Sequence, residues 1–255
     1  MTATEAHAPV QVYGIYLSPA VRKVLVVLDL KGIAYEIDPL MPFMGNQAFS
    51  KLSPLRRVPV MVDNGVVIRD STIICEYLDE RYPSPPILPK NPVDRARARW
   101  LEEFADLRMQ EVLIEDFVIQ IMINPRVWGQ PTDDAVVEHT KAHGIPHALD
   151  YLEGELPQDA FVFGEVSVAD IAIASVVRTA ELYGFKIDPG RWPATAALVD
   201  RTLALESFVK LRSFEQTLSK TPPPEHWDAL ARCGAPLVAK TLGTEQPRRG
   251  PMGQH

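Results

Sequence analysis

Hydrophobic and polar positions follow two different rhythms along the chain, and the change of rhythm divides it into two parts. Between residues 11 and 83, short β-branched runs alternate with runs of helical period, as in a mixed sheet with crossover helices. The dipeptide Asn64-Gly65 predicts a hairpin turn. The pattern predicts strands at residues 12–17, 35–39, 58–62 and 66–69, and helices at residues 19–31, 48–52 and 71–81.

The second part lacks strand patterns and is predicted to be helical. Four prolines between residues 83 and 89 form a stiff connector, since proline blocks a continuing helix. Beyond them, apolar residues recur on one helical face at Trp100, Leu101, Phe104 and Leu107. Helices are expected at residues 93–122, 132–156, 168–183, 193–204 and 206–218.

This division predicts two domains and a C-terminal extension. The α/β domain is expected at residues 10–83 and the all-helical domain at residues 92–220. The extension at residues 221–255 is expected to form one short helix at residues 227–233 and a loose tail from residue 246, because the tail is rich in Pro, Gly and Arg.

Charge and cysteine content narrow the class of protein. A net charge of −7 argues against broad binding of nucleic acid or of anionic membranes, because both depend on clustered Lys and Arg. The apolar runs at residues 24–30 and 117–123 are too short to cross a bilayer. Residues 1–9 lack the pattern of a secretory signal and are expected to fray. Cys75 and Cys233 form no disulfide or zinc pattern, which favours the cytoplasm.

Four short motifs give the chain a family resemblance. They are Ser18-Pro19-Ala20-Val21-Arg22-Lys23-Val24, Val58-Pro59 before the predicted hairpin, Asp70-Ser71 at a helix start, and Ser167-Val168-Ala169-Asp170. With them, residues 12–218 resemble the glutathione transferase superfamily, in its serine-type cytosolic class. The resemblance implies a thioredoxin-like α/β N-terminal domain, an all-α C-terminal domain, and glutathione as co-substrate.

Ser18 is the candidate catalytic residue. It ends a strand and precedes Pro19, so its first role is that of a helix cap. The same position suits an anion, because a hydroxyl and unpaired backbone N–H groups surround a helix N-terminus. The resemblance implies that this anion is the thiolate of glutathione. Tyr13 and Tyr16 are rival donors, and Tyr16 is the nearer to the turn.

Three further segments are candidates for glutathione binding through the resemblance. Val58 would offer its backbone to the cysteinyl part if Pro59 is cis, whereas a trans proline on an edge strand would be ordinary structure. Ser71 would bind the γ-glutamyl carboxylate and Asp70 the α-amino group, although Ser71 is also a plain helix-start residue. Arg57 would lie near the glycyl end.

The glycyl end departs from the pattern of the family. Arg56 stands where relatives usually have Gly, and with Arg57 it is expected to form a positive rim for the anionic tripeptide. Many relatives place Lys or His where this chain has Gly45 and Asn46. The Ser167–Asp170 motif has the spacing of a capping box and is expected to start a buried helix rather than to form a site.

A second pocket is expected to hold a small hydrophobic electrophile. The candidate walls are Tyr16, Phe43, Val112, Glu115 and Ile119. No metal is expected, because Gly144 and Pro146 interrupt the helix that carries His139, His143 and His147.

The sequence therefore predicts an enzyme of the glutathione transferase type. The alternative is a non-catalytic relative that keeps the fold for binding or scaffolding. Glutathione-dependent oxidoreduction is disfavoured, because disulfide exchange needs a thiolate where Ser18 stands. A homodimer is expected, since residues 93–122 carry apolar side chains on more than one side of the helix, among them Leu113, Ile114, Phe117, Val118 and Ile121. The alternative is that residues 227–242 cover this helix in a monomer.

Overall fold

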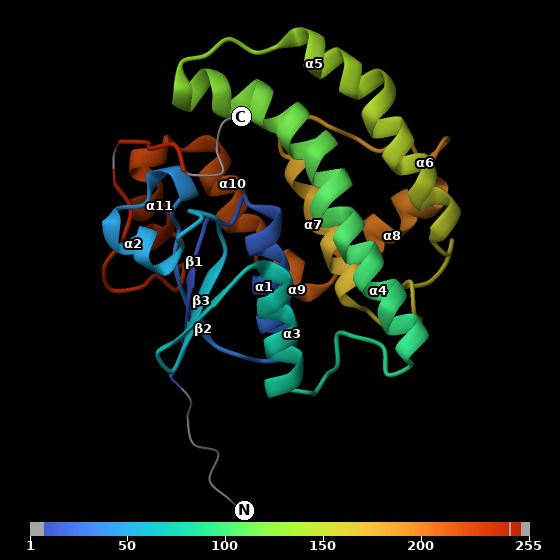
Figure 1. Cartoon of the computed structure of the whole chain (residues 1–255), viewed down its shortest axis with the longest axis horizontal. Helices are drawn as coiled ribbons and strands as arrows, with labels where there is room; N and C mark the ends of the chain where they lie inside the picture. Colours follow the sequence, from blue (N-terminus) through green and yellow to red (C-terminus); the bar gives the residue numbers. More distant parts are fainter. Residues whose placement is uncertain (1–7, 245, 251–255) are drawn as a thin grey trace, which may run out of the picture. The chain divides into compact units, whose positions relative to one another are not determined.

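The computed structural model describes residues 8–244 and 246–250, so the predictions for residues 1–7 and 251–255 lie outside the described chain. The chain divides into two compact units. The first combines Met1–Pro85 with Leu211–His255, and the second is Pro86–Lys210. Figure 1 gives the course of the chain and the labels of its elements.

The first unit is built on a four-stranded mixed sheet. Its strands lie in the order β2-β1-β3-β4, with β1 parallel to β2 and the other pairs antiparallel. The expected hairpin is confirmed, and Asn64 and Gly65 both adopt positive φ at its turn. The strands are β1 (Val10–Tyr13), β2 (Tyr35–Asp38), β3 (Val60–Asp63) and β4 (Val66–Arg69).

Helices cover both faces of this sheet. α1 (Pro19–Leu30) and α3 (Ser71–Arg81) pack against each other on one side (Figure 1). On the other face, Phe49 of α2 (Gln47–Leu52) packs with Tyr13 and Val60 in a buried cluster. Alternation of side chains along the strands supplies both faces with apolar residues, which is the pattern of a sheet covered on two sides. The connection from β2 to α2 includes the short helix η1 (Pro42–Met44).

The C-terminal end of the chain belongs to this first unit. It contains α10 (Arg212–Lys220), η4 (Pro223–Glu225) and α11 (His226–Arg232). Glu215 of α10 forms a buried ion pair with Arg22 of α1, with 2.5 Å between Nε and Oε1. Phe214 packs against Tyr16, with 4.9 Å between ring centroids. The helical unit therefore ends at Lys210 and not at residue 220 as expected. The reason is that α10 is held in the first unit by contacts with α1 and with the turn before α1.

The tail after residue 246 is not loose in its described part. The backbone N–H of Arg248 donates to the carbonyl of Phe43 at 2.7 Å. Leu237 pairs with Ile37 at the free edge of β2, so the extension adds to the sheet before it reaches the β2–α2 connection. Local hydrophobic periodicity does not reveal a pairing between residues that lie two hundred positions apart in the sequence, such as Ile37 and Leu237.

The second unit is helical, as expected. Its centre is α7, which packs against α4, η2 and α8. Ser167 and Asp170 form the expected capping box at its start, and Asp170 also accepts a hydrogen bond from the Val162 N–H at 3.0 Å. Burial raises the pKa of the Asp170 carboxyl. The elements are α4 (Pro92–Phe104), η2 (Ala105–Trp128), α5 (Asp134–His139), η3 (Thr140–Gly144), α6 (Ile145–Glu155), α7 (Val168–Glu181), α8 (Pro193–Leu203) and α9 (Glu206–Val209).

Gly144 and Pro146 do not interrupt their helix, which corrects the sequence analysis. The chain stays helical from α5 through η3 into α6 because the wider turn of η3 accommodates the proline. Gly144 is required there by packing, since a Cβ would lie 2.6 Å from Thr140 Oγ1 and 3.0 Å from Val112 Cγ1. Among the described residues, no helix has the length and apolar character of a membrane span.

Candidate active site

Ser18 occupies the N-cap of α1 and is half-buried. Its Oγ accepts a hydrogen bond from the Val21 N–H at 3.4 Å, and Pro19 takes the first helical position. This is the expected capping geometry. Because Oγ accepts this bond, its own hydrogen is available to donate to an anion beside the helix N-terminus.

Gly14 brings the first turn of α1 close to Val58. Its φ is 148°, and a Cβ at this position would lie 2.4 Å from Val21 Cγ2 and 3.0 Å from Val58 Cβ. Only a residue without a side chain allows this approach. The peptide bond between Val58 and Pro59 is cis, which confirms the prediction made from the sequence.

The third candidate segment lies at the start of α3. Asp70, with φ of 75°, is the N-cap, and its Oδ1 accepts from the Thr72 N–H at 3.0 Å and the Ile73 N–H at 3.4 Å. Ser71 is the first helical residue and is buried. Lys23 of α1 joins this segment to the Ser18 helix, since its Nζ donates to Thr72 Oγ1 at 3.3 Å.

Arg56 does not contribute to a solvated rim, which corrects the expectation for the arginine pair. Its guanidinium holds the β2–α2 connection: Nη2 donates to the carbonyls of Pro42 at 3.1 Å and Gly45 at 2.9 Å, and Nη1 donates to Ser50 Oγ at 2.7 Å. Its φ of 52° turns the chain toward these acceptors. Arg57 is exposed, and its backbone is fixed by two hydrogen bonds with the Ser53 hydroxyl.

Tyr16 is buried in the first unit and does not line a pocket. It has no exposed surface, and its ring lies against Phe214 of α10. Burial raises the pKa of its phenol far above the ordinary value, so it remains protonated. Burial and then the charge of Asp38 raise the pKa of Tyr13, whose ring belongs to the Phe49 cluster. Both tyrosines are buried, whereas Ser18 is half-buried.

The other expected pocket residues divide between the two units. Phe43 lies half-buried in η1 of the first unit. Val112 is buried in the second unit with Cγ1 toward Gly144, so it offers no surface to a ligand. Glu115 is exposed and Ile119 is half-buried, both on η2. That Phe43, Glu115 and Ile119 line one pocket remains a prediction.

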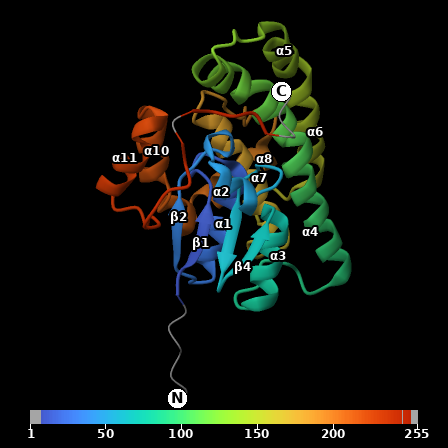
Figure 2. The same ribbon diagram turned by 60° about the vertical axis from the view of Figure 1, so that its left-hand side comes forward.

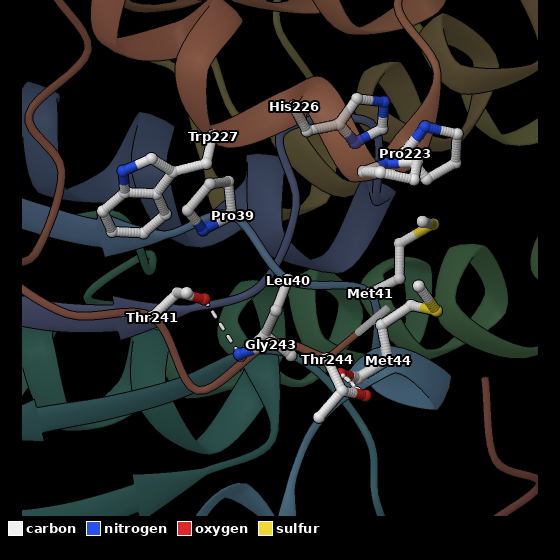
Figure 3. Close-up of a pocket in the computed structure, with 11 residues that line it drawn as sticks. Pro39, Leu40, Met41, Met44, Pro223, His226, Trp227, Thr241, Gly243 and Thr244 are labelled. Carbon is white, nitrogen blue, oxygen red and sulfur yellow. Dashed lines mark hydrogen bonds between the residues drawn. The ribbon is translucent and has the colours of Figure 1, made fainter. Parts of the chain in front are cut away.

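A separate hollow of about 280 Å³ lies in the first unit, between residues 39–44 and the extension (Figure 3). Its wall contains the thioethers of Met41 and Met44 and the ring of Trp227. Burial lowers the pKa of His226, which also lines it. None of the candidate glutathione-binding residues lies in this wall. In residues 8–244 and 246–250, no group of three or more His, Cys, Asp or Glu side chains is placed to hold a metal.

Two residues that assemble the site were missed in the sequence. Lys23 is fully buried, although its place in the predicted helix gave it no special role. Gly14 carried one usable signal, because a glycine directly after an apolar strand indicates a close backbone approach. The position of Lys23 depends on α3, about fifty residues further along, and has no local signal.

Known proteins are similar to this chain over most of its length. The family model described as the N-terminal domain of glutathione S-transferase matches residues 12–86. The uncharacterized GST-like protein YibF of Escherichia coli is 32% identical over 202 residues, which are 77% of this chain and 95% of that protein. The chain belongs to the glutathione S-transferase family. Maleylacetoacetate isomerase of Rattus norvegicus is 32% identical over 213 residues, covering 80% of this chain and 92% of that enzyme.

The glutathione S-transferase fold is also shared with solved structures. The crystal structure of a glutathione S-transferase from Rhodospirillum rubrum F11 matches with a TM-score of 0.74 at 27% identity. The match covers 86% of this chain and 99% of that one. The expected thioredoxin-like N-terminal sheet and helical C-terminal part are therefore confirmed.

Proposed function

We propose that the protein is a serine-type glutathione transferase, in which Ser18 stabilises the thiolate of bound glutathione. The observation that carries the proposal is the place of Ser18: its hydroxyl caps the N-terminus of α1, whose first turn meets Val58 across Gly14 through the side chain of Val21. A free thiol has a pKa of about 8.5, and one charge-assisted hydrogen bond can lower it by about one to two units. A single serine is thus sufficient.

The same three segments would bind the tripeptide. The backbone of Val58 would pair with the cysteinyl part, with Pro59 fixing its orientation. Ser71, through its hydroxyl and its backbone N–H at the start of α3, would hold the γ-glutamyl carboxylate. The exposed Asp70 carboxylate would attract the α-amino group, and Arg57 would lie at the glycyl end.

The proposed reaction is nucleophilic attack by the glutathione sulfur. The thiol loses its proton to water, and Ser18 donates a hydrogen bond to the resulting thiolate. The sulfur then forms a bond to an electrophilic carbon of a small hydrophobic substrate. With an aryl halide the carbon–halogen bond breaks and halide departs with its electron pair, and with an unsaturated carbonyl the π electron pair moves to the carbonyl oxygen, which takes a proton from water. Conjugation and isomerisation share this first step, and the rat relative is named an isomerase, so the substrate panel has to include both types.

Titration calorimetry with glutathione tests the proposal. The full chain is expected to bind glutathione with a dissociation constant below about 1 mM, a free energy of about −4 kcal/mol or better. Binding should be followed by turnover of at least one substrate from a panel of aryl halides, unsaturated carbonyls and cis-configured unsaturated acids. Absence of binding at millimolar glutathione would contradict the transferase.

A second candidate function is a non-catalytic binding protein with this fold. The observation that favours it is the commitment of Arg56 to the carbonyls of Pro42 and Gly45, since this guanidinium supports the loop instead of a ligand. Glutathione binding without turnover of any panel member would support this second function. Under either function we propose that the protein is a homodimer in the cytoplasm.

A further inference from the structure

The C-terminal extension contacts the edge of the sheet and then the β2–α2 connection. The Ile37 N–H donates to the carbonyl of Pro236 at 2.7 Å, and the Val238 N–H donates to the carbonyl of Ile37 at 3.1 Å. The buried carboxylate of Asp38 then accepts from Thr241 Oγ1 at 2.8 Å and from the Leu242 N–H at 2.6 Å. In Figure 2 this segment, in red, runs beside β2.

Beyond Asp38 the extension crosses residues 41–46. Residues 236–244 and 246–250 of the extension are called the strap. The Asn46 N–H donates to the carbonyl of Leu242 at 2.8 Å, and the Thr244 N–H donates to the carbonyl of Met44 at 2.6 Å. Figure 3 shows Thr244 beside Met44. Leu242 packs against the Phe49 cluster, so the strap has both polar and apolar anchors.

The end of the strap lies over Arg56. The Arg248 N–H donates to Phe43, and a Cβ on Gly250 would lie 3.2 Å from Arg56 Cβ. Arg56 Nε is buried and has no hydrogen-bond partner in the described chain. Arg56 and Arg248 bond to the carbonyls of consecutive residues, Pro42 and Phe43, and burial and then the positive charge of Arg248 lower the pKa of Arg56.

This arrangement concentrates positive charge where the loop has none. Residues 39–46 contain no charged side chain, and Gly45 is packed against Phe49. Arg56 and Arg248 repel each other, and Arg57 adds a third guanidinium next in sequence. A carboxylate beside these groups would relieve the repulsion and would form charge-assisted hydrogen bonds with Arg248 and Arg57.

We propose that the strap completes the ligand site, with Arg248 as the residue that binds the glycyl carboxylate of glutathione beside Arg56 and Arg57. This inference rests on the proposed function. Glutathione has two carboxylates, and the γ-glutamyl one is assigned to Ser71. Arg56 and Arg57 directly precede Val58 in the chain, so the remaining carboxylate of an extended tripeptide lies on their side. The C-terminal extension thereby supplies a charge that the β2–α2 connection lacks.

The test compares glutathione with its glycyl monoethyl ester, which is neutral at that end. Calorimetry is carried out on the full chain and on Arg248→Gln, which keeps the backbone N–H that binds Phe43. The substitution is expected to weaken glutathione binding about tenfold and to leave ester binding unchanged. Arg248→Lys should recover part of the lost affinity, because it restores the charge without the planar fork.

Arg232→Gln is the matched control, since it removes the same charge from an exposed residue of the extension in α11. It is expected to change neither affinity. Equal weakening of both ligands by Arg248→Gln, or no weakening of either, would overturn the role of Arg248 while leaving the proposed function intact. Failure of the unaltered chain to bind either ligand would overturn both.

Discussion

At the scale of single residues, the candidate site depends on a close approach that one glycine allows. Gly14 separates β1 from the Ser18 turn, and its φ of 148° directs the chain between Val21 and Val58. Because Gly14 has no Cβ, Val21 in the first turn of α1 and Val58 before β3 both pack against its backbone. The proposed site therefore depends on the packing at a residue that is not itself proposed to bind a ligand.

Gly14→Ala is expected to destabilise the protein and to weaken glutathione binding together. The new methyl group would overlap Val21 and would require a strained φ, at a cost of at least about 2 kcal/mol in the free energy of unfolding. Urea denaturation and glutathione titration measure the two effects. Gly32→Ala is the control, because Gly32 has φ of 66° but no atom within 4 Å of a Cβ. Equal losses of stability and of glutathione affinity in the two variants would contradict the packing role of Gly14.

Local signals predicted part of the site and missed the rest. Local signals indicated Ser18 and Ser71 only as residues at helix starts and Pro59 as an unusual residue in an apolar strand, and the family resemblance then made them site candidates. The tie between Arg56 and residues 42–45 and the contact of Arg248 with Phe43 have no such signal. They depend on backbone conformation and on segments about two hundred residues apart, which local periodicity does not encode.

At the scale of elements, a buried ion pair and the packing of Phe214 on Tyr16 hold α10 in the thioredoxin-like unit. Arg22 and Glu215 are both buried, and Arg22 Nη2 also donates to the Tyr16 carbonyl at 3.3 Å. Arg22 stands in the same motif as Ser18, four residues further on. The pair thus fixes the turn before α1 as well as the docking of α10.

Glu215→Ala is expected to lower the free energy of unfolding by about 3–5 kcal/mol, because it leaves the Arg22 charge buried without its carboxylate. Glu215→Gln should cost less, since it keeps one acceptor. The exposed pair of Lys210 and Glu206 provides a control, and Glu206→Gln should change stability by less than about 1 kcal/mol. Denaturation midpoints of the three variants measure this order. A Glu215→Ala variant as stable as the Glu206→Gln control would contradict it.

The elements also show which boundaries a pattern can predict. α3 begins and ends where expected, because Asp70 caps it and prolines follow it closely. β1 ends at Tyr13, earlier than expected, because Gly14 turns the chain away from the sheet. α5, η3 and α6 run through Gly144 and Pro146, where tertiary packing against Val112 outweighs helix propensity.

At the scale of the whole molecule, the reason given for a dimer needs correction. Leu113, Ile114, Phe117 and Val118 are all buried within the single chain. The exposed apolar residues of α4 and η2 are instead Val93 at 77%, Trp100 at 51% and Leu107 at 62%. Their spacing of seven residues places them on one stripe of the helix. Of the segment considered as a cover in a monomer, residues 227–242, Pro236 and Val238 bond to Ile37 of β2 in the first unit.

We expect a homodimer that buries this stripe. Light scattering coupled to size exclusion should give twice the chain mass of 28.4 kDa. The double variant Val93→Glu, Leu107→Glu should give the chain mass, because charges in a buried interface are costly. Val209→Glu, on an exposed residue of α9, should leave the dimer intact. A monomeric unaltered chain at micromolar concentration would contradict the dimer.

The central claim is that Ser18 stabilises the thiolate of bound glutathione, and the ultraviolet absorbance of that thiolate across pH tests it most directly. In Ser18→Ala the apparent pKa of the bound thiol should rise by about one unit or more, with glutathione affinity nearly unchanged. Ser18→Thr, which keeps the hydroxyl, should titrate close to the unaltered protein. A thiol in Ser18→Ala that titrates at the same pH as in the unaltered chain would contradict the account.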